Sequence, residues 1–167
     1  MSPDVAEFLL HLVQAQTLNA AADDIDQFAA HIPVGAGTTV TGALLALEDG
    51  EPQFAVFNVG DSRVYLLADD EFVRVTRDHS VVQEMVDAGL LDERHAEDHP
   101  ESNVITRAVG FHEPPRPDVW MLPVRPGMRL LLCSDGLTKE VDDREIRRHL
   151  AEGGTAAETA DGLMDAA

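Results

Sequence analysis

The sequence predicts an α+β fold in which an antiparallel β-sandwich is flanked by helices, and three observations support this prediction. Short β-branched and apolar runs fill the middle of the chain, turn residues separate these runs, and amphipathic patterns stand near both ends. Antiparallel strands need a second layer to bury their apolar faces. A two-sheet sandwich meets this need, but periodicity alone does not distinguish it from a single sheet covered by helices.

The first 33 residues are predicted to be helical. Ser2-Pro3-Asp4 is typical of a helix start, because Ser can cap, Pro suits the first helical position and Asp favours the positive end of the dipole. The apolar face that follows consists of Val5, Phe8, Leu9, Leu12 and Val13. A second helix is expected over residues 23–30, and Pro33 should stop it.

Residues 35–135 are predicted to form a strand-rich core. Strands are expected at residues 38–47, 54–59, 63–67, 72–75, 104–109, 119–122 and 129–133. The first four should form an antiparallel meander, because Asp49-Gly50 is a strong hairpin signal and only Gly60-Asp61-Ser62 separates the second strand from the third. This meander would place Asp61 at one tip.

Helices and a long loop complete the predicted elements. A short helix is expected after Ser80, whose side chain can begin a capping box, and before Ala88-Gly89. Residues 91–117 show little periodicity, and a loop of this length is usually functional or mobile. Two further helices are expected within residues 142–167, with capping boxes that begin at Asp142 and Thr155.

Composition argues against several functional classes. The net charge of −19 repels phosphate backbones and anionic lipids, so neither nucleic acid nor a membrane is an expected partner. Cys133 is the only cysteine, so no disulfide can form within the chain, and its apolar run favours a buried thiol over a nucleophile. The sequence shows neither a secretory signal nor a long apolar segment, and a cytoplasmic location is therefore expected.

Two aspartates stand beside glycines at the ends of apolar runs. Asp61 follows the run that ends at Val59, and Asp135 follows the run that ends at Cys133. Either segment alone could be an ordinary turn, because Asp and Gly are common turn residues. Two carboxylates on neighbouring strand ends are also a common way to hold a hard divalent cation. The residues alone therefore leave an ordinary turn and a metal site formed by Asp61 and Asp135 both open.

Five stretches of the sequence stand in a characteristic order. They are Gly37-Thr38-Thr39-Val40, Val59-Gly60-Asp61-Ser62-Arg63-Val64-Tyr65, Thr76-Arg77-Asp78-His79-Ser80, His99-Pro100 through Ile105-Thr106-Arg107-Ala108-Val109-Gly110, and Leu131-Leu132-Cys133-Ser134-Asp135-Gly136-Leu137. Together they resemble the bacterial form of the metal-dependent protein phosphatases of type 2C, the PPM family. The resemblance covers about residues 35–145. It implies a sandwich of two antiparallel sheets with two Mg²⁺ or Mn²⁺ ions at one end, where a bridging water attacks the phosphorus of phosphoserine or phosphothreonine.

The resemblance also implies roles for individual residues. Asp135 matches a metal-ligating aspartate of the family, and Asp61 matches an aspartate associated with a third, more weakly held metal. Residues 91–103 match the flap, a mobile loop that influences substrate access, and Asp98, His99 and Ser102 are expected to contribute to it. No catalytic side chain and no residue for an organic cofactor is assigned.

Three elements of the family pattern have no match in the sequence. They are an early Asp-Gly-Met-Gly-Gly whose aspartate bridges the two metals, an upstream arginine that binds the substrate phosphate, and a late Asp-Asn. We therefore expect residues 1–167 to form a single, incomplete PPM-type domain that lacks the first and last strands. With only Asp135 left for the main pair of ions, metal binding should be weak and the isolated chain impaired or inactive.

The expected function is the dephosphorylation of phosphoserine and phosphothreonine proteins in signalling, with a Ser/Thr kinase as the opposing partner. Open sheet edges are also expected to offer a surface for pairing. The alternative is a non-catalytic pseudophosphatase that acts as a binding or regulatory module. A third reading is an acidic α+β domain whose motifs carry neither function.

Overall fold

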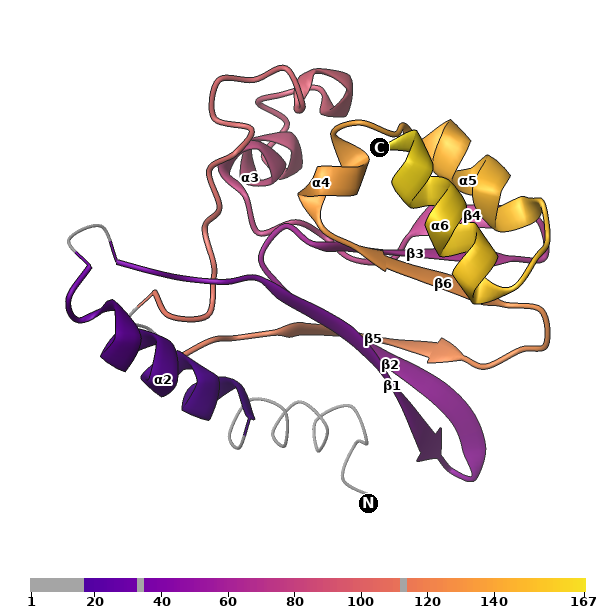
Figure 1. Cartoon of the computed structure of the whole chain (residues 1–167), viewed down its shortest axis with the longest axis horizontal. Coiled ribbons are helices and arrows are strands. Elements are labelled where there is room, and N and C mark those ends of the chain that lie inside the picture. The colour runs from indigo at the N-terminus through magenta and orange to yellow at the C-terminus, as the bar shows by residue number, and fades with distance from the viewer. Residues whose placement is uncertain (1–16, 33–34, 112–113) are drawn as a thin grey trace.

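Two antiparallel β-sheets form the centre of the molecule in the computed structural model, which describes residues 17–32, 35–111 and 114–167. The strands are β1 (Val40–Glu48), β2 (Glu51–Val59), β3 (Arg63–Ala68), β4 (Glu71–Arg74), β5 (Asp118–Pro123) and β6 (Arg129–Cys133). The first sheet has the order β1-β2-β5, and the second has the order β4-β3-β6. Figure 1 shows the second sheet above the first. The sandwich prediction is confirmed, and the single-sheet alternative is wrong.

Helices lie outside the two sheets. They are α2 (Asn19–Ala29), α3 (Val81–Asp87), the 3-10 helix η2 (Glu93–His95), α4 (Asp135–Thr138), α5 (Asp143–Ala151) and α6 (Ala156–Ala166). Helices α5 and α6 lie over the second sheet, where a buried apolar cluster is formed by Tyr65, Leu67, Val141, Ile146, Leu150 and Leu163. Leu18 and Ala22 pack against Val59 of β2 and Val109. Both sheets therefore contribute to apolar cores, and consecutive residues of β2 and β3, such as Val64 and Tyr65, are buried.

The predicted helix starts at Ser80, Asp142 and Thr155 are confirmed. Each side chain accepts a hydrogen bond from a backbone N–H three residues later, which satisfies one of the free donors at the helix start. Within the described residues, the full reciprocal capping box forms only at Thr155. Gln83 instead binds Arg74 and Asp87, so that α3 is tied to β4.

The predicted four-strand meander is wrong at its centre. β1 pairs with β2 and β3 pairs with β4, but β2 and β3 belong to different sheets. The chain crosses between the sheets at residues 60–62, where Gly60 has a φ of +108° that only glycine adopts readily. Asp61 therefore lies at a crossover between sheets and not at the tip of a hairpin.

The strand predicted at residues 104–109 is also wrong. This segment forms two isolated bridges, Ile105 with Ser80 and Val109 with Thr38. Its backbone groups bind extended segments outside the sheets, as in the hydrogen bond from Thr106 N–H to the carbonyl of His79 at 2.8 Å. The described part of the chain therefore contains six strands and not seven.

The remaining differences concern the helices. The predicted helix that begins at Ser2 lies outside the described residues, and the next one is confirmed as α2, which begins at Asn19 and not at Asp23. The short helix α4 was not predicted. None of the described helices combines the length and the apolar character needed to cross a membrane. The assignment of residues 1–167 to a single incomplete domain stays a prediction.

Candidate metal centre

Asp61 and Asp135 lie at the same end of one pair of strands. Asp61 precedes β3 by two residues and Asp135 follows β6 by two residues, and these strands pair so that Arg63 faces Cys133. Continuing this antiparallel register by two residues places Asp61 opposite Asp135. The structure thus brings the two carboxylates together, and their role as metal ligands stays a prediction.

The surroundings of Asp61 favour a nearby cation. Burial raises the pKa of its carboxyl, a backbone hydrogen bond lowers it, and the negative charges of Asp135 and Asp78 raise it again. The net result is a raised pKa, because local donors do not fully offset burial and repulsion. A divalent cation placed between Asp61 and Asp135 would relieve this repulsion.

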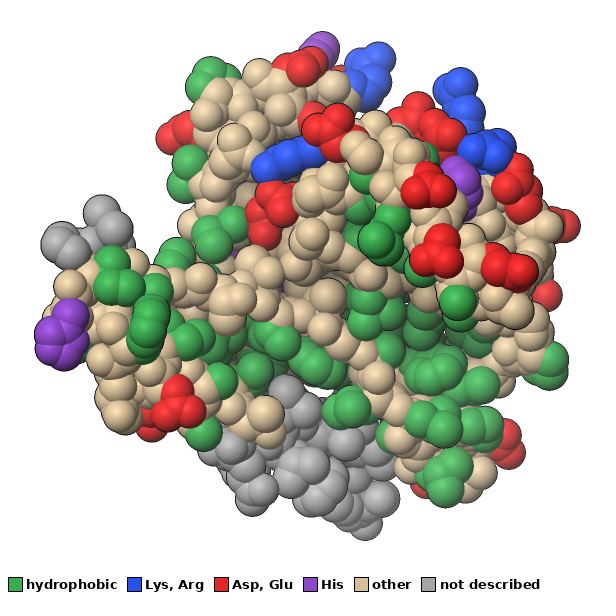
Figure 2. Space-filling model, viewed as in Figure 1, with side chains coloured by type: hydrophobic (Ala, Val, Ile, Leu, Met, Phe, Trp, Pro, Cys, Tyr) green, Lys and Arg blue, Asp and Glu red, His purple; other side chains and the backbone are tan. Residues whose placement is uncertain are grey.

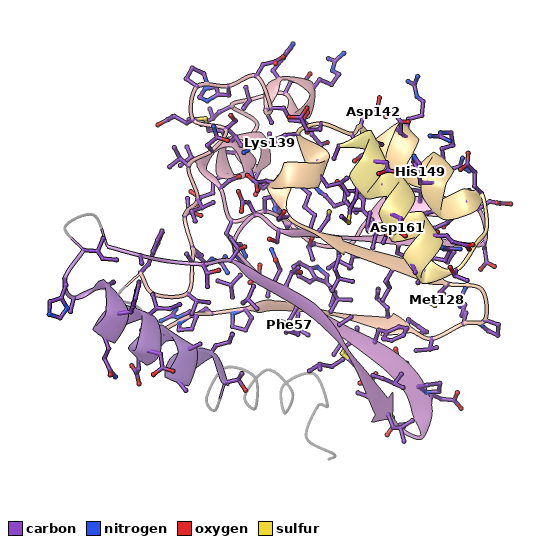
Figure 3. The ribbon with its side chains drawn as sticks, in the orientation of Figure 1. Phe57, Met128, Lys139, Asp142, His149 and Asp161 are labelled. Carbon is purple, nitrogen blue, oxygen red and sulfur yellow. The ribbon has the colours of Figure 1, made fainter. Side chains whose placement is uncertain are left out.

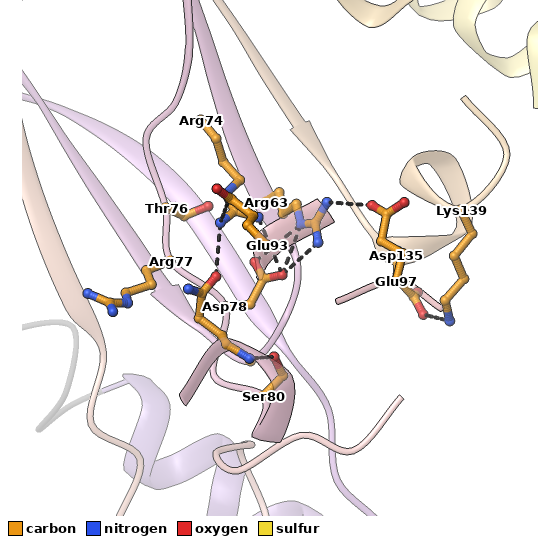
Figure 4. Close-up of polar contacts among 12 residues, drawn as sticks. Arg63, Arg74, Thr76, Arg77, Asp78, Ser80, Glu93, Glu97, Asp135 and Lys139 are labelled. Carbon is orange, nitrogen blue, oxygen red and sulfur yellow. Dashed lines mark hydrogen bonds and ion pairs between the residues drawn. The ribbon is translucent and has the colours of Figure 1, made fainter. Parts of the chain in front are cut away.

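Asp135 has a counter-ion within its own helical turn. Lys139 Nζ lies 2.5 Å from Asp135 Oδ2, in an i,i+4 ion pair at α4 (Figure 4). Figure 3 shows Lys139 at the end of α4. Lys139 is the only lysine in the sequence, and its i,i+4 spacing from Asp135 is a signal that sequence analysis missed. The ammonium group stands beside the carboxylate where a metal ion would bind, so Asp135 is accessible to a cation.

Asp78 is a third carboxylate near Asp61, but arginines already neutralise it. Arg63 donates hydrogen bonds to both Asp78 oxygens at 2.8–3.2 Å, and Arg74 Nη1 lies 3.8 Å from Oδ2 (Figure 4). Burial alone would lower the pKa of Arg63, but the hydrogen bonds and the charge of Asp78 raise it. Asp78 is thus engaged by two arginines, and it is not free to bind a metal.

The described residues contain no complete metal site. Among residues 17–32, 35–111 and 114–167, no three His, Cys, Asp or Glu side chains are arranged to hold a metal ion. Asp61 and Asp135 suit Mg²⁺ or Mn²⁺, because these ions prefer carboxylate oxygens, but Mg²⁺ takes about six oxygen ligands. The remaining oxygen ligands of such an ion would come from water and from groups other than these two aspartates.

The predicted flap residues lie in tight turns that follow η2. Ser102 N–H donates to the carbonyl of His99 at 2.9 Å, and the His99 ring accepts a hydrogen bond from Glu101 N–H at 3.2 Å. Asp98 is exposed in the same segment. These contacts are local, and the influence of Asp98, His99 and Ser102 on substrate access stays a prediction.

Two glutamates join this segment to the second sheet. Glu93 Oε1 lies 3.6 Å from Arg74 Nη2, and Glu97 Oε1 lies 3.9 Å from Arg63 Nη1 (Figure 4). Both glutamates are exposed, so salt should screen these ion pairs. Sequence analysis missed both contacts, because charge alone does not reveal partners that are distant in the sequence. The flap segment is thus attached beside Arg63, two residues after Asp61.

Comparisons with known proteins provide an independent test. No family model matches the chain. The curated serine/threonine phosphatase stp of Listeria innocua is 39% identical over 127 residues, which are 76% of this chain and 49% of that protein. The crystal structure of the Mycobacterium tuberculosis serine/threonine phosphatase PstP/Ppp is similar with a TM-score of 0.78 and 33% identity, over 97% of this chain and 74% of that chain.

A second solved structure concerns the metal directly. The catalytic domain of the serine/threonine protein phosphatase PstP, in complex with two manganese ions, is similar with a TM-score of 0.77 and 34% identity. The similarity covers 95% of this chain and 64% of that chain. The chain spans about half the length of the curated relatives that it matches.

Proposed function

Because the chain belongs to the PPM-type serine/threonine phosphatases, we propose that it acts in the metal-dependent hydrolysis of phosphoserine and phosphothreonine in proteins. The observation that carries this proposal is the position of Asp61 and Asp135 at one end of the β3–β6 pair. Two carboxylates with a net repulsion form a binding site for a hard divalent ion.

The metal would supply the nucleophile, since a bound divalent ion lowers the pKa of water enough to provide hydroxide near neutral pH. Asp61 and Asp135 would hold the ion. Arg63 holds Asp78 in a separate ion pair, which keeps that carboxylate engaged although its charge still acts on Asp61. Both Mg²⁺ and Mn²⁺ suit these ligands, and the manganese complex of PstP supports Mn²⁺ as the probe.

A binding or regulatory module is the alternative. The specific observation in its favour is that the described residues contain no group of three metal-binding side chains. A site with two protein carboxylates should hold Mn²⁺ weakly, because hard divalent ions take about six oxygen ligands. We therefore propose that the isolated chain binds metal weakly and turns over slowly or not at all.

Mn²⁺ calorimetry and hydrolysis of p-nitrophenyl phosphate test these proposals on the 167-residue chain. Asp135→Asn should abolish both signals, and Asp61→Asn should weaken metal binding. Asp69→Asn is the matched control, because it removes one negative charge from an exposed turn where φ is +50°, a conformation that Asn tolerates. Absence of binding at millimolar Mn²⁺ would refute the metal assignment. Metal binding without turnover, together with binding of a phosphopeptide, would favour the module.

The proposal includes a cellular setting. A Ser/Thr kinase is the natural opposing partner of such an activity, and a signalling role in the cytoplasm is proposed with it. Pairing through a sheet edge is proposed as well, because β1 lies at the edge of its sheet and its Leu45 and Leu47 are 69% and 66% exposed. Figure 2 shows hydrophobic side chains at the surface around the β1–β2 hairpin. Sedimentation at increasing concentration tests this pairing, which Leu47→Lys should abolish.

A further inference from the structure

The turn that carries Asp61 is held by hydrogen bonds to a buried histidine. Gly60 N–H donates to Nδ1 of His79 at 3.0 Å, and the Gly60 carbonyl accepts from His79 N–H at 2.9 Å. The same carbonyl accepts from Nδ2 of Asn58 at 2.9 Å. Both backbone polar groups of Gly60, the residue before Asp61, are therefore fixed.

These contacts determine which ring nitrogen of His79 carries the proton. Nδ1 accepts from Gly60, so the proton resides on Nε2, which lies 3.1 Å from Asp118 Oδ2 and donates to it. Arg107 Nη1 donates to the other Asp118 oxygen at 2.9 Å. Burial would raise the pKa of Asp118, but the hydrogen bonds from Arg107 and His79 lower it, so Asp118 remains a carboxylate that accepts from Nε2–H.

The position of His79 excludes direct contact with a substrate. Its side chain is only 4% exposed, and Asn58 is fully buried. On the opposite side of the turn, a Cβ built on Gly60 would come within 2.3 Å of Thr39, whose hydroxyl lies 2.9 Å from that of Ser62. The turn is thus held from two sides, and His79 contributes the only side chain that binds the Gly60 N–H among the described contacts.

We propose that His79 is a positioning residue for Asp61. Its Nδ1 holds Gly60, and Asp118 fixes the tautomer that makes Nδ1 an acceptor. The Asp61 carboxylate is thereby directed toward Asp135, in the way that partners behind metal ligands orient them. This inference rests on the proposed metal site, but the hydrogen bonds that carry it do not depend on metal.

Two substitutions separate positioning from mere packing. His79→Asn retains an acceptor at the place of Nδ1 and loses the donor to Asp118. His79→Gln places its amide donor at Nε2, so it retains the bond to Asp118 and loses the acceptor for Gly60. Both variants bury a side-chain amide in place of the ring, so a role in packing alone should affect them alike.

NMR of the metal-free chain gives the first test. Nitrogen spectra of His79 should show the proton on Nε2. The Gly60 amide should exchange with solvent at the wild-type rate in His79→Asn and about tenfold faster in His79→Gln, because one buried hydrogen bond is lost. Side-chain couplings of Asp61 should show one rotamer in wild type and in His79→Asn, and averaging in His79→Gln.

Mn²⁺ calorimetry gives the second test. His79→Gln should weaken binding about tenfold, the lower end of the loss expected for a partner behind a metal ligand, while His79→Asn should stay within about twofold of wild type. A proton on Nδ1, or equal behaviour of the two variants, would overturn the positioning role. If wild type binds no Mn²⁺, the proposed metal site fails, while the amide exchange and the Asp61 rotamers still decide the role of His79.

Discussion

Replacing Lys139 with Gln tests whether Asp135 is open to a divalent ion. A metal at Asp135 must displace the Lys139 ammonium, which lies 2.5 Å from Oδ2. The two side chains are 52% and 47% exposed, and an exposed ion pair contributes about 0.2–1 kcal/mol. Removing this competitor should therefore strengthen Mn²⁺ binding by about 1.4- to 5-fold, since 1.4 kcal/mol corresponds to a factor of ten.

Calorimetric titration of wild type and Lys139→Gln at low ionic strength measures this effect, because salt screens exposed charges. Arg125→Gln is the matched control. It also removes one positive charge from an exposed ion pair, with Asp69 at 3.4 Å, but it lies before β6 whereas Asp135 follows that strand. Both variants make the net charge more negative by one unit, so the control separates local competition from general attraction of cations. Arg125→Gln should leave the affinity nearly unchanged.

Unchanged or weaker Mn²⁺ binding by Lys139→Gln would refute the reasoning. A second measurement uses the fact that Lys139 is the only lysine. Its acetylation, followed by peptide mass spectrometry, should become faster with Mn²⁺, because a displaced ammonium is more accessible to the reagent. A slower reaction in the presence of Mn²⁺ would count equally against displacement.

Three further predictions concern the surroundings of the site. Gly60→Ala should lower the free energy of unfolding by about 3 kcal/mol or more, because the new Cβ would clash with Thr39. Gly50→Ala places its Cβ in open space and should cost only about 1–2 kcal/mol, the cost of its positive φ. Urea unfolding measures both losses, and equal losses would contradict the clash. Arg63→Met should cost about 1.5–3 kcal/mol in the same assay, because Asp78 loses its hydrogen bonds from Arg63 and keeps only Arg74 at 3.8 Å. Adding Asp78→Asn should recover part of this loss, and no recovery would argue against the ion pair. Burial raises the pKa of Cys133 to about 11, so a disulfide reagent should react slowly with this thiol at pH 8. The rate should rise about tenfold for each unit of pH increase until the pH reaches that pKa. Rapid reaction at pH 8 would show an exposed thiol.

Local signals predicted much of the fold. The Asp49-Gly50 hairpin joins β1 to β2 in the structure, and Ser80, Asp142 and Thr155 begin helices as expected. Each of these features depends on residues within about four positions of one another, which a single sequence displays directly. The helix start at Asn19, before the predicted Asp23, differs because α2 carries no side-chain cap to mark its beginning.

Pairing between distant strands could not be predicted in the same way. β3 pairs with β6 across a large part of the chain, and an alternating apolar pattern shows which side chains share a face without identifying the partner strand. The same limitation explains the false strand at residues 104–109, whose apolar pattern reflects packing against extended segments. The crossover at Gly60 was therefore mistaken for a hairpin, since both use a glycine at positive φ.

The candidate site shows a similar division. The Asp-Gly pattern and the resemblance predicted Asp61 and Asp135, and the strand pairing brings them to one end of the second sheet. The ion pair of Arg63 with Asp78 and the bond from Gly60 to His79 link positions that are far apart in the chain, so their function as supports was not evident.

The motifs that identified the family now have distinct physical roles. Asp78 and His79 belong to one motif and Arg107 to another, yet all three bind groups around the crossover that carries Asp61. These motifs therefore contain residues that hold the segment around the Asp61 carboxylate in place, rather than a complete set of metal ligands. A chain can retain that support, and with it the family resemblance, while its described residues contain no group of three metal-binding side chains. Fold integrity and metal affinity should consequently respond to different substitutions: Gly60 and Arg63 control the first, and Asp135 controls the second.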